Sequence, residues 1–96
     1  MADLSSMVRV HVFVQGHVQG VGFRAFTARQ AKSHQVDGWV RNVRDGRVEV
    51  EAQGLRESVE KFLVELERGP ALSNVREVSV EWIEPKDQES TFEVKY

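Results

Sequence analysis

The sequence contains no cysteine among its 96 residues. Disulfide frameworks, cysteine zinc sites, iron–sulfur clusters and thiol nucleophiles are therefore excluded, and a cytoplasmic setting is the default expectation. No apolar run approaches the ~18 residues that a membrane helix needs, so no membrane association is expected. Residues 1–7 also lack the basic and apolar regions of a signal peptide.

An excess of positive charge is missing as well. Thirteen Lys and Arg residues stand against fifteen Asp and Glu residues, which gives a net charge of −2. Domains that bind nucleic acid normally carry a basic patch, so no nucleic-acid partner is expected. The length allows one two-layer core. We therefore expect a single domain over residues 7–96, preceded by a disordered N-terminal extension over residues 1–6.

Two periodicities of apolar residues alternate along the chain. Alternation with period two predicts strands at 8–14, 36–43, 47–53, 75–83 and 92–96. Helical spacing predicts helices from Phe23 to about His34 and from Leu55 to the Gly69-Pro70 stop. The order β-α-β-β-α-β with a terminal strand predicts the α+β class. The expected architecture is a ferredoxin-like βαββαβ two-layer sandwich, an antiparallel sheet with two helices on one face.

The connection between the second and third strands contains Asp45-Gly46, which indicates a two-residue hairpin because both positions tolerate positive φ. In the third strand, alternation predicts buried valines and exposed Glu49 and Glu51. The sheet face away from the helices is expected to be partly solvated, with Phe13 and Trp39 half-exposed.

The segment between the first strand and the first helix holds three of the seven glycines. It reads Gln15-Gly16-His17-Val18-Gln19-Gly20-Val21-Gly22-Phe23-Arg24. Glycines let backbone N–H groups converge, and the helix start adds unpaired donors, so the segment is typical of a phosphate-binding loop. It lacks the Gly-Lys-Ser/Thr of a Walker loop and the third glycine of the dinucleotide fingerprint. A glycine-rich turn without a ligand is the alternative.

Two polar residues point to the same place. Arg24 lies in the first turn of the helix, where the helix dipole disfavours a cation, and an anion bound beside it would remove that conflict. Asn42 ends the second strand, which the topology places parallel to the first, so it is expected at the same sheet edge as the loop. A solvated surface arginine and a turn-capping asparagine are the alternatives. His11, His17 and His34 show no metal-ligand spacing, so no metal is expected.

The segment from Val14 to Arg24, together with Gly38-Trp39-Val40-Arg41-Asn42, resembles the acylphosphatase family. Phe92-Glu93-Val94-Lys95-Tyr96 is similar to that family's C-terminal strand, and Gly69-Pro70 fits its helix–strand junction. The resemblance covers the chain from about Met7 onwards.

This resemblance implies hydrolysis of the carboxyl–phosphate bond of acyl phosphates. The loop from Gly16 to Phe23 and the Arg24 guanidinium would bind the phosphoryl oxygens, and Asn42 would orient the attacking water. No metal, no cofactor and no covalent enzyme intermediate would be needed, and the partners would be a small acyl phosphate and inorganic phosphate. The enzyme would be a monomer. His17 and Lys95 stand where many members of the family have arginine.

A second interpretation belongs to another class. The same fold hosts many functions, so the chain is alternatively a non-catalytic regulatory module that binds an anion. Because both Arg24 and Asn42 are present, the enzyme is the preferred interpretation.

Overall fold

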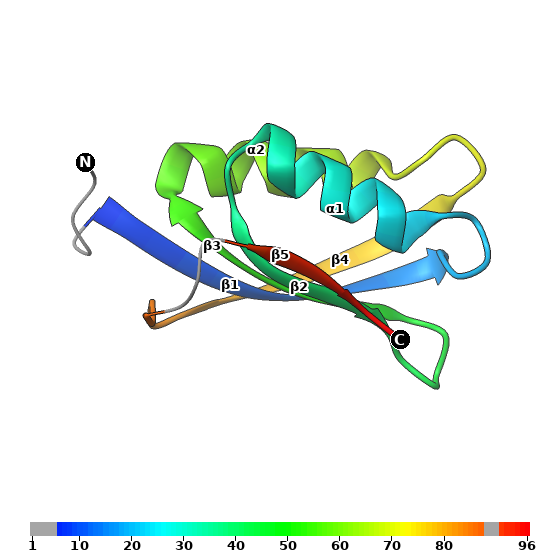
Figure 1. The fold of residues 1–96 in the computed structure, drawn as a ribbon. Helices are drawn as coiled ribbons and strands as arrows, with labels where there is room; N and C mark the ends of the chain where they lie inside the picture. The colour runs from blue at the N-terminus through cyan, green and yellow to red at the C-terminus, as the bar shows by residue number, and fades with distance from the viewer. Residues whose placement is uncertain (1–5, 88–90) are drawn as a thin grey trace.

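The computed structural model describes residues 6–87 and 91–96. The elements follow the predicted order: β1 (Met7–His17), α1 (Phe23–Ser33), β2 (Asp37–Asn42), β3 (Val48–Leu55), α2 (Arg56–Arg68), β4 (Asn74–Ile83) and β5 (Phe92–Lys95). Both helices lie on one face of the sheet (Figure 1), which confirms the ferredoxin-like α+β sandwich. Most of the predicted N-terminal extension, residues 1–5, lies outside the described residues.

The core lies between the sheet and the two helices, as the two periodicities predict. Val10, Val12 and Val14 of β1 are fully buried, because alternate strand residues point to the same face. Phe62 and Leu66 of α2 are fully buried as well. In the described part of the chain, neither helix is long and apolar enough to cross a membrane.

The strand order in the sheet is β4-β1-β3-β2-β5. The C-terminal ends of β1, β2 and β5 lie at the same end of this sheet. β1 and β2 both pair antiparallel with β3, so they run in the same direction. β5 pairs with β2 in parallel, with Lys95 opposite Arg41. The sheet is therefore antiparallel over four strands and mixed at its β5 edge, and the C-terminus reaches the same end of the molecule as the β1–α1 loop (Figure 1).

The β2–β3 connection is longer than the predicted two-residue hairpin. Val43 N–H donates to the Arg47 carbonyl at 2.8 Å, and Gly46 N–H donates to the Val43 carbonyl at 3.0 Å. The loop therefore has three residues, 44–46. The left-handed conformation occurs at Gly46, with φ +100°, and not at Asp45, which is the usual arrangement in three-residue hairpins.

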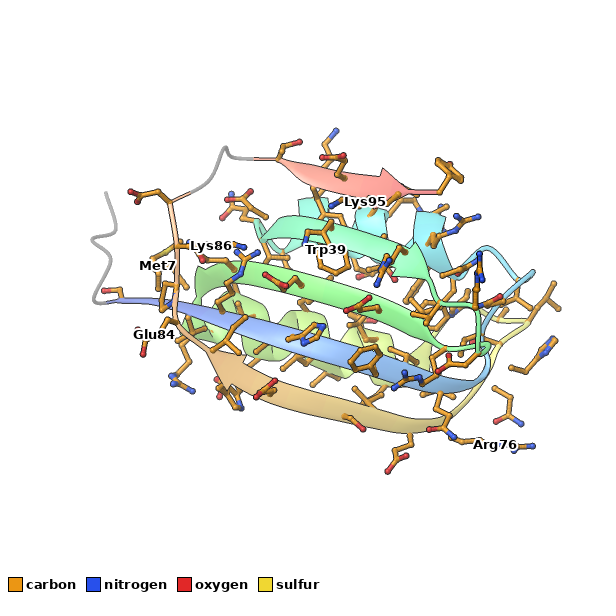
Figure 2. The ribbon with its side chains drawn as sticks, turned by 90° about the horizontal axis from the view of Figure 1, so that it is seen from below. Met7, Trp39, Arg76, Glu84, Lys86 and Lys95 are labelled. Atoms are coloured by element: carbon orange, nitrogen blue, oxygen red, sulfur yellow. The ribbon has the colours of Figure 1, made fainter. Side chains whose placement is uncertain are left out.

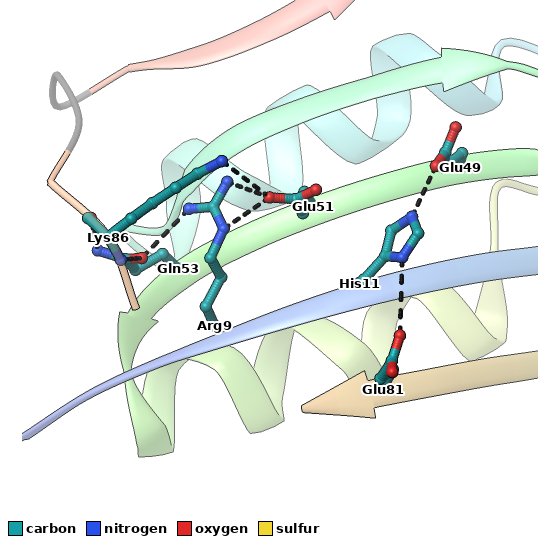
Figure 3. A network of polar contacts seen from close by, with 7 residues as sticks. All are labelled: Arg9, His11, Glu49, Glu51, Gln53, Glu81 and Lys86. Atoms are coloured by element: carbon teal, nitrogen blue, oxygen red, sulfur yellow. Dashed lines mark hydrogen bonds and ion pairs between the residues drawn. The ribbon is translucent and has the colours of Figure 1, made fainter. Parts of the chain in front are cut away.

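The sheet face away from the helices carries a network of ion pairs (Figures 2 and 3). The prediction that Glu49 and Glu51 are exposed is wrong, since Glu49 is 7% exposed and Glu51 is half-buried. Glu49 lies 2.6 Å from His11 Nε2 and accepts a hydrogen bond from Arg41 Nε. Glu51 accepts one from Arg9 Nε at 2.7 Å. Long cationic side chains from neighbouring strands cover both carboxylates, which alternation along one strand does not reveal.

Phe13 and Trp39, on the sheet face away from the helices, are half-buried, as predicted. Arg47 Cζ lies 4.1 Å from the centroid of the Phe13 ring, and Lys95 Nζ lies 4.9 Å from that of Trp39. Figure 2 shows Trp39 and Lys95 side by side on neighbouring strands. Cations on the ring faces stabilise these aromatics where no helix covers them.

Candidate active site

The glycine-rich segment begins inside the sheet. Gly16 and His17 occupy the last two positions of β1 and pair with Val75 and Asn74 of β4. The segment between the strand and the helix is therefore 18–22, because Gly16 and His17 of the predicted loop belong to β1 and Phe23 begins α1. The pairing of β1 with β4 shifts register at a β-bulge between Gln15 and Gly16 and then continues to His17.

Two glycines give this loop its shape. Gly20 and Gly22 have φ of +75° and +78°, and a Cβ at either position would meet no atom within 4 Å. Glycine is needed here for its left-handed backbone, and the space beside it is open. Val18 is 1% exposed and anchors the start of the loop in the core.

Helix α1 begins with an unusual concentration of positive charge. Gly22 is its N-cap, no side chain among the described residues caps it, and no acidic residue lies in its first turn. The N–H groups of a first turn have no partner within the helix and form the positive end of the helix dipole. Arg24 adds a full positive charge at this point.

Arg24 is held by the C-terminal strand through neutral groups. Its Nη1 donates to the Lys95 carbonyl at 3.1 Å, and its Cζ lies 4.5 Å from the centroid of the Tyr96 ring. No carboxylate forms an ion pair with it within 6–87 or 91–96. The guanidinium is therefore oriented without being neutralised, and the interpretation of a freely solvated arginine does not fit these contacts.

Asn42 is the last residue of β2 and is half-buried. Among the described residues, no group hydrogen-bonds its side-chain amide, so the amide is available to a ligand or a water. The turn-capping role is not observed for it. The turn is instead stabilised by the Asp45 carboxylate, which accepts a hydrogen bond from Arg47 N–H at 3.1 Å.

A hollow of about 210 Å³ unites these residues. Its lining comes from the loop, the start of α1, and the ends of β2 and β5: Val18, Gly20, Gly22, Phe23, Arg24, Ala25, Asn42, Val94 and Tyr96. Arg24 and Asn42 thus share one hollow with four predicted loop residues. The predicted loop residues Gly16, His17, Gln19 and Val21 are not among its lining residues.

The contribution of β5 was not predicted. The sequence indicates a terminal strand but not its partner, and parallel pairing with β2 carries Val94 and Tyr96 to the hollow. A last strand that runs parallel to β2 ends beside Asn42, but the sequence does not indicate that pairing.

A larger hollow of about 580 Å³ lies elsewhere, between the C-terminal half of α1 and the start of β5. Arg29 and Lys32 line it, together with Asp37, and burial raises the pKa of the Asp37 carboxyl. It contains none of the predicted site residues and no glycine loop. The smaller hollow therefore remains the candidate site, because it joins backbone donors, a cation and a free amide.

The donor set of the smaller hollow suits an anion rather than a cation. No Asp, Glu or His side chain lines it, and nowhere in the described ranges do three His, Asp or Glu side chains converge in a way that could hold a metal ion. Backbone N–H groups and a guanidinium bind phosphoryl oxygens well. The chemistry that this arrangement favours is the binding and transfer of a phosphoryl group.

Comparison with known proteins also points to the transfer of a phosphoryl group. The sequence model of the acylphosphatase family matches residues 10–94. Acylphosphatases of Chloroflexus aurantiacus and Moorella thermoacetica are 47% and 48% identical to this chain, over 92% and 94% of it and 96% of each relative. The crystal structure of acylphosphatase from Bacillus subtilis superposes with a TM-score of 0.89 at 34% identity, covering 93% of this chain and 99% of that one. The chain therefore belongs to the acylphosphatase family.

Proposed function

We propose that the protein hydrolyses acyl phosphates, with the loop and Arg24 binding the phosphoryl group and Asn42 orienting the attacking water. The balanced reaction is RCO–OPO₃²⁻ + H₂O → RCOO⁻ + H₂PO₄⁻. The observation that carries the proposal is the shared hollow: an arginine without a carboxylate partner and an asparagine without a hydrogen-bond partner, among the described residues, line it together. Membership of the family supports the same reaction.

The phosphoryl group would bind where positive potential is concentrated. The loop amides, the first turn of α1 and the Arg24 guanidinium all lie at this end of the molecule. Phosphoryl transfer depends mainly on positioning and on stabilising the charge of the equatorial oxygens. A preorganised set of donors at this position would stabilise that charge in the transition state.

The water would attack phosphorus in line with the leaving carboxylate. The P–O bond to the acyl group breaks, and the carboxylate leaves with its electron pair. Asn42, at the end of β2, would hold this water through its free amide. A carboxylate is a good leaving group and needs no general acid, which matches a hollow without an acidic side chain.

The proton of the water would go to a phosphoryl oxygen of the substrate. No side chain that lines the hollow is a general base at neutral pH. The substrate therefore takes the role that a histidine or a carboxylate fills in other hydrolases. No residue of the protein would be covalently modified during the reaction.

The proposed roles need one copy of the chain, because Arg24, Asn42 and the loop of the same chain line one hollow, and a monomer is the predicted state. We also propose that the ligands are a small acyl phosphate and inorganic phosphate, that the protein binds no nucleic acid, and that it is located in the cytoplasm.

The experiment that tests the proposal measures phosphate release from benzoyl phosphate in the presence of excess chelator. We expect full activity that persists after dialysis against the chelator. Activity that is lost and then restored by magnesium or zinc would contradict the assignment of the site. Phosphate binding without turnover would support the non-catalytic alternative.

A further inference from the structure

The side chain of Gln19 lies outside the proposed catalytic hollow, although Gln19 is part of the loop. It is half-buried and does not line the hollow. Its Nε2 donates two hydrogen bonds instead, to the carbonyl of Val43 at 2.7 Å and to the carbonyl of Arg47 at 2.9 Å. One amide group of the loop is therefore bound to both strands of the β2–β3 hairpin.

These two carbonyls belong to the rung that closes the hairpin. The Arg47 carbonyl also accepts the Val43 N–H, and the Val43 carbonyl also accepts the Gly46 N–H. Gln19 thus joins a rung that the hairpin already forms by itself. Because the hairpin has its own hydrogen bonds, the added pair chiefly fixes where the loop lies relative to it.

Val43 directly follows Asn42, so the contact of Gln19 with Val43 fixes the position of the loop relative to Asn42. The loop carries the proposed phosphate donors and the hairpin base carries the proposed water holder. We propose that Gln19 is a positioning residue that holds the loop in register with Asn42, so that the water lies in line with the phosphoryl group. The inference rests on the proposed function and adds to it a residue that acts through another.

The chemistry requires a donor at this position. Both partners of Gln19 are carbonyl oxygens, which only accept hydrogen bonds. Methionine has a similar length and no donor, so Gln19→Met removes both bonds while keeping most of the volume. Glutamate has nearly the same shape, but when ionised it presents a carboxylate to two carbonyl oxygens.

The chain offers a matched control at the opposite end of the sheet. Gln53 also binds backbone through its side chain, donating to the Lys86 carbonyl at 2.8 Å and accepting from Lys86 N–H at 2.9 Å. It is 4% exposed and lies far along β3 from the hairpin. Its Oε1 also accepts a hydrogen bond from the buried Arg9 at 3.2 Å, so Gln53→Met removes backbone hydrogen bonds away from the site at a cost in stability at least as large.

The first experiment compares kcat, competitive inhibition by inorganic phosphate, and thermal unfolding for both variants. Both should unfold at a temperature several degrees lower. Gln19→Met should also lose up to about 100-fold in kcat, because a small misplacement of the water is enough for such a loss. Its phosphate inhibition constant should stay nearly unchanged, since the loop amides and Arg24 remain. Gln53→Met should keep both constants.

The second experiment combines Gln19→Met with Asn42→Ala. If Gln19 acts through Asn42, the double variant should be hardly slower than Asn42→Ala alone. Multiplied losses would contradict this. Should Gln19→Met fail to fold, Gln19→Glu replaces it: its kcat relative to wild type should rise as the pH falls from about 6 to about 4, because protonation of the carboxyl restores a donor. A flat ratio would overturn the inference.

The outcomes separate the two proposals. If Arg24→Ala and Asn42→Ala abolish turnover while Gln19→Met behaves like Gln53→Met, the positioning role is wrong and the proposed function stands. If the wild-type chain does not hydrolyse benzoyl phosphate, both are wrong.

Discussion

Two arginines of the molecule, Arg9 and Arg24, lie in very different surroundings. Arg9 is 1% exposed and contacts Glu51 and Gln53, with Lys86 Nζ 3.5 Å from the same Glu51 carboxylate (Figure 3). We call these four residues the Arg9 cluster. Arg24, in contrast, contacts only neutral groups among the described residues, a carbonyl and an aromatic ring.

The difference separates structural charge from functional charge. In the Arg9 cluster the buried guanidinium has the Glu51 carboxylate as its opposite partner, as burial requires, and the exposed Lys86 shares that carboxylate. Arg24 is oriented by the Lys95 carbonyl and the Tyr96 ring but keeps its charge, beside a helix start that is itself positive. A bound anion would be the missing partner. The same residue type therefore serves the fold at one place and, we propose, the reaction at the other.

The largest effect is expected at Arg24. Arg24→Ala should lower kcat/KM by about 10³–10⁵, the range that stabilising arginines give in phosphoryl transfer. Arg24→Lys should also be poor, because an ammonium group cannot make a bidentate contact with phosphate. Steady-state hydrolysis of benzoyl phosphate measures both. A variant within tenfold of wild type would show that the charge is not used.

The opposite pattern is expected at Arg9. Arg9→Leu breaks a buried ion pair, and such changes cost about 3–5 kcal/mol of unfolding free energy. Lys86 still faces Glu51, so the loss should fall near the lower value. Chemical denaturation measures it. Activity per folded molecule should be that of wild type, and a selective loss of kcat would erase the distinction between the two regions.

Asn42 should separate turnover from phosphate binding. Asn42→Ala should lower kcat by about 10²–10³, the loss typical of one preorganised group. Competitive inhibition by inorganic phosphate should remain, because the loop and Arg24 still bind the anion, whereas Arg24→Ala should weaken it. If Asn42→Ala keeps its kcat and only unfolds earlier, Asn42 is structural and another group holds the water.

The smallest effect concerns the dependence of stability on pH. Burial by itself raises the pKa of Glu49, but hydrogen bonds from His11 and Arg41 outweigh it and hold the pKa below its ordinary value. A carboxyl with a lowered pKa in the fold stabilises it above the pKa of the unfolded chain, and this stabilisation is lost as the pH falls through the folded pKa. Wild type should therefore lose unfolding free energy between about pH 5 and pH 2.

Glu49→Gln removes this share of the pH dependence. Its unfolding free energy should be lower than that of wild type at neutral pH, and the difference should shrink in acid. Denaturant titrations at several pH values give both curves. Parallel curves would mean that Glu49 is not held in its ionised form by His11 and Arg41.

Much of the fold can be predicted from local pattern. Alternating valines in β1 and the apolar stripe of α2 each identify one element and its buried face. The burial of a strand residue by side chains of neighbouring strands cannot be read from the pattern of one strand. Glu49, for example, is covered by His11 and Arg41 on the strands beside it. The hairpin loop is one residue longer than the sequence predicts, because Asp45 binds Arg47 through its carboxylate and does not adopt positive φ.

The candidate site was predictable in part, for the same reason. Glycines and a misplaced cation mark the loop and Arg24 in the sequence, and chain direction brings Asn42 to the same edge. The parts contributed by side chains over long distances in sequence are not marked. These are the contact of Tyr96 with Arg24 and that of Gln19 with the hairpin.

The most direct test of the central claim is a titration of the protein with inorganic phosphate, followed through its backbone amide resonances. We predict saturable shifts at 18–24 and at Asn42, which should need a much higher phosphate concentration in Arg24→Ala and the wild-type concentration in Arg9→Leu. Shifts centred instead on the larger hollow around Arg29 and Lys32, or an unchanged phosphate affinity in Arg24→Ala, would contradict the account.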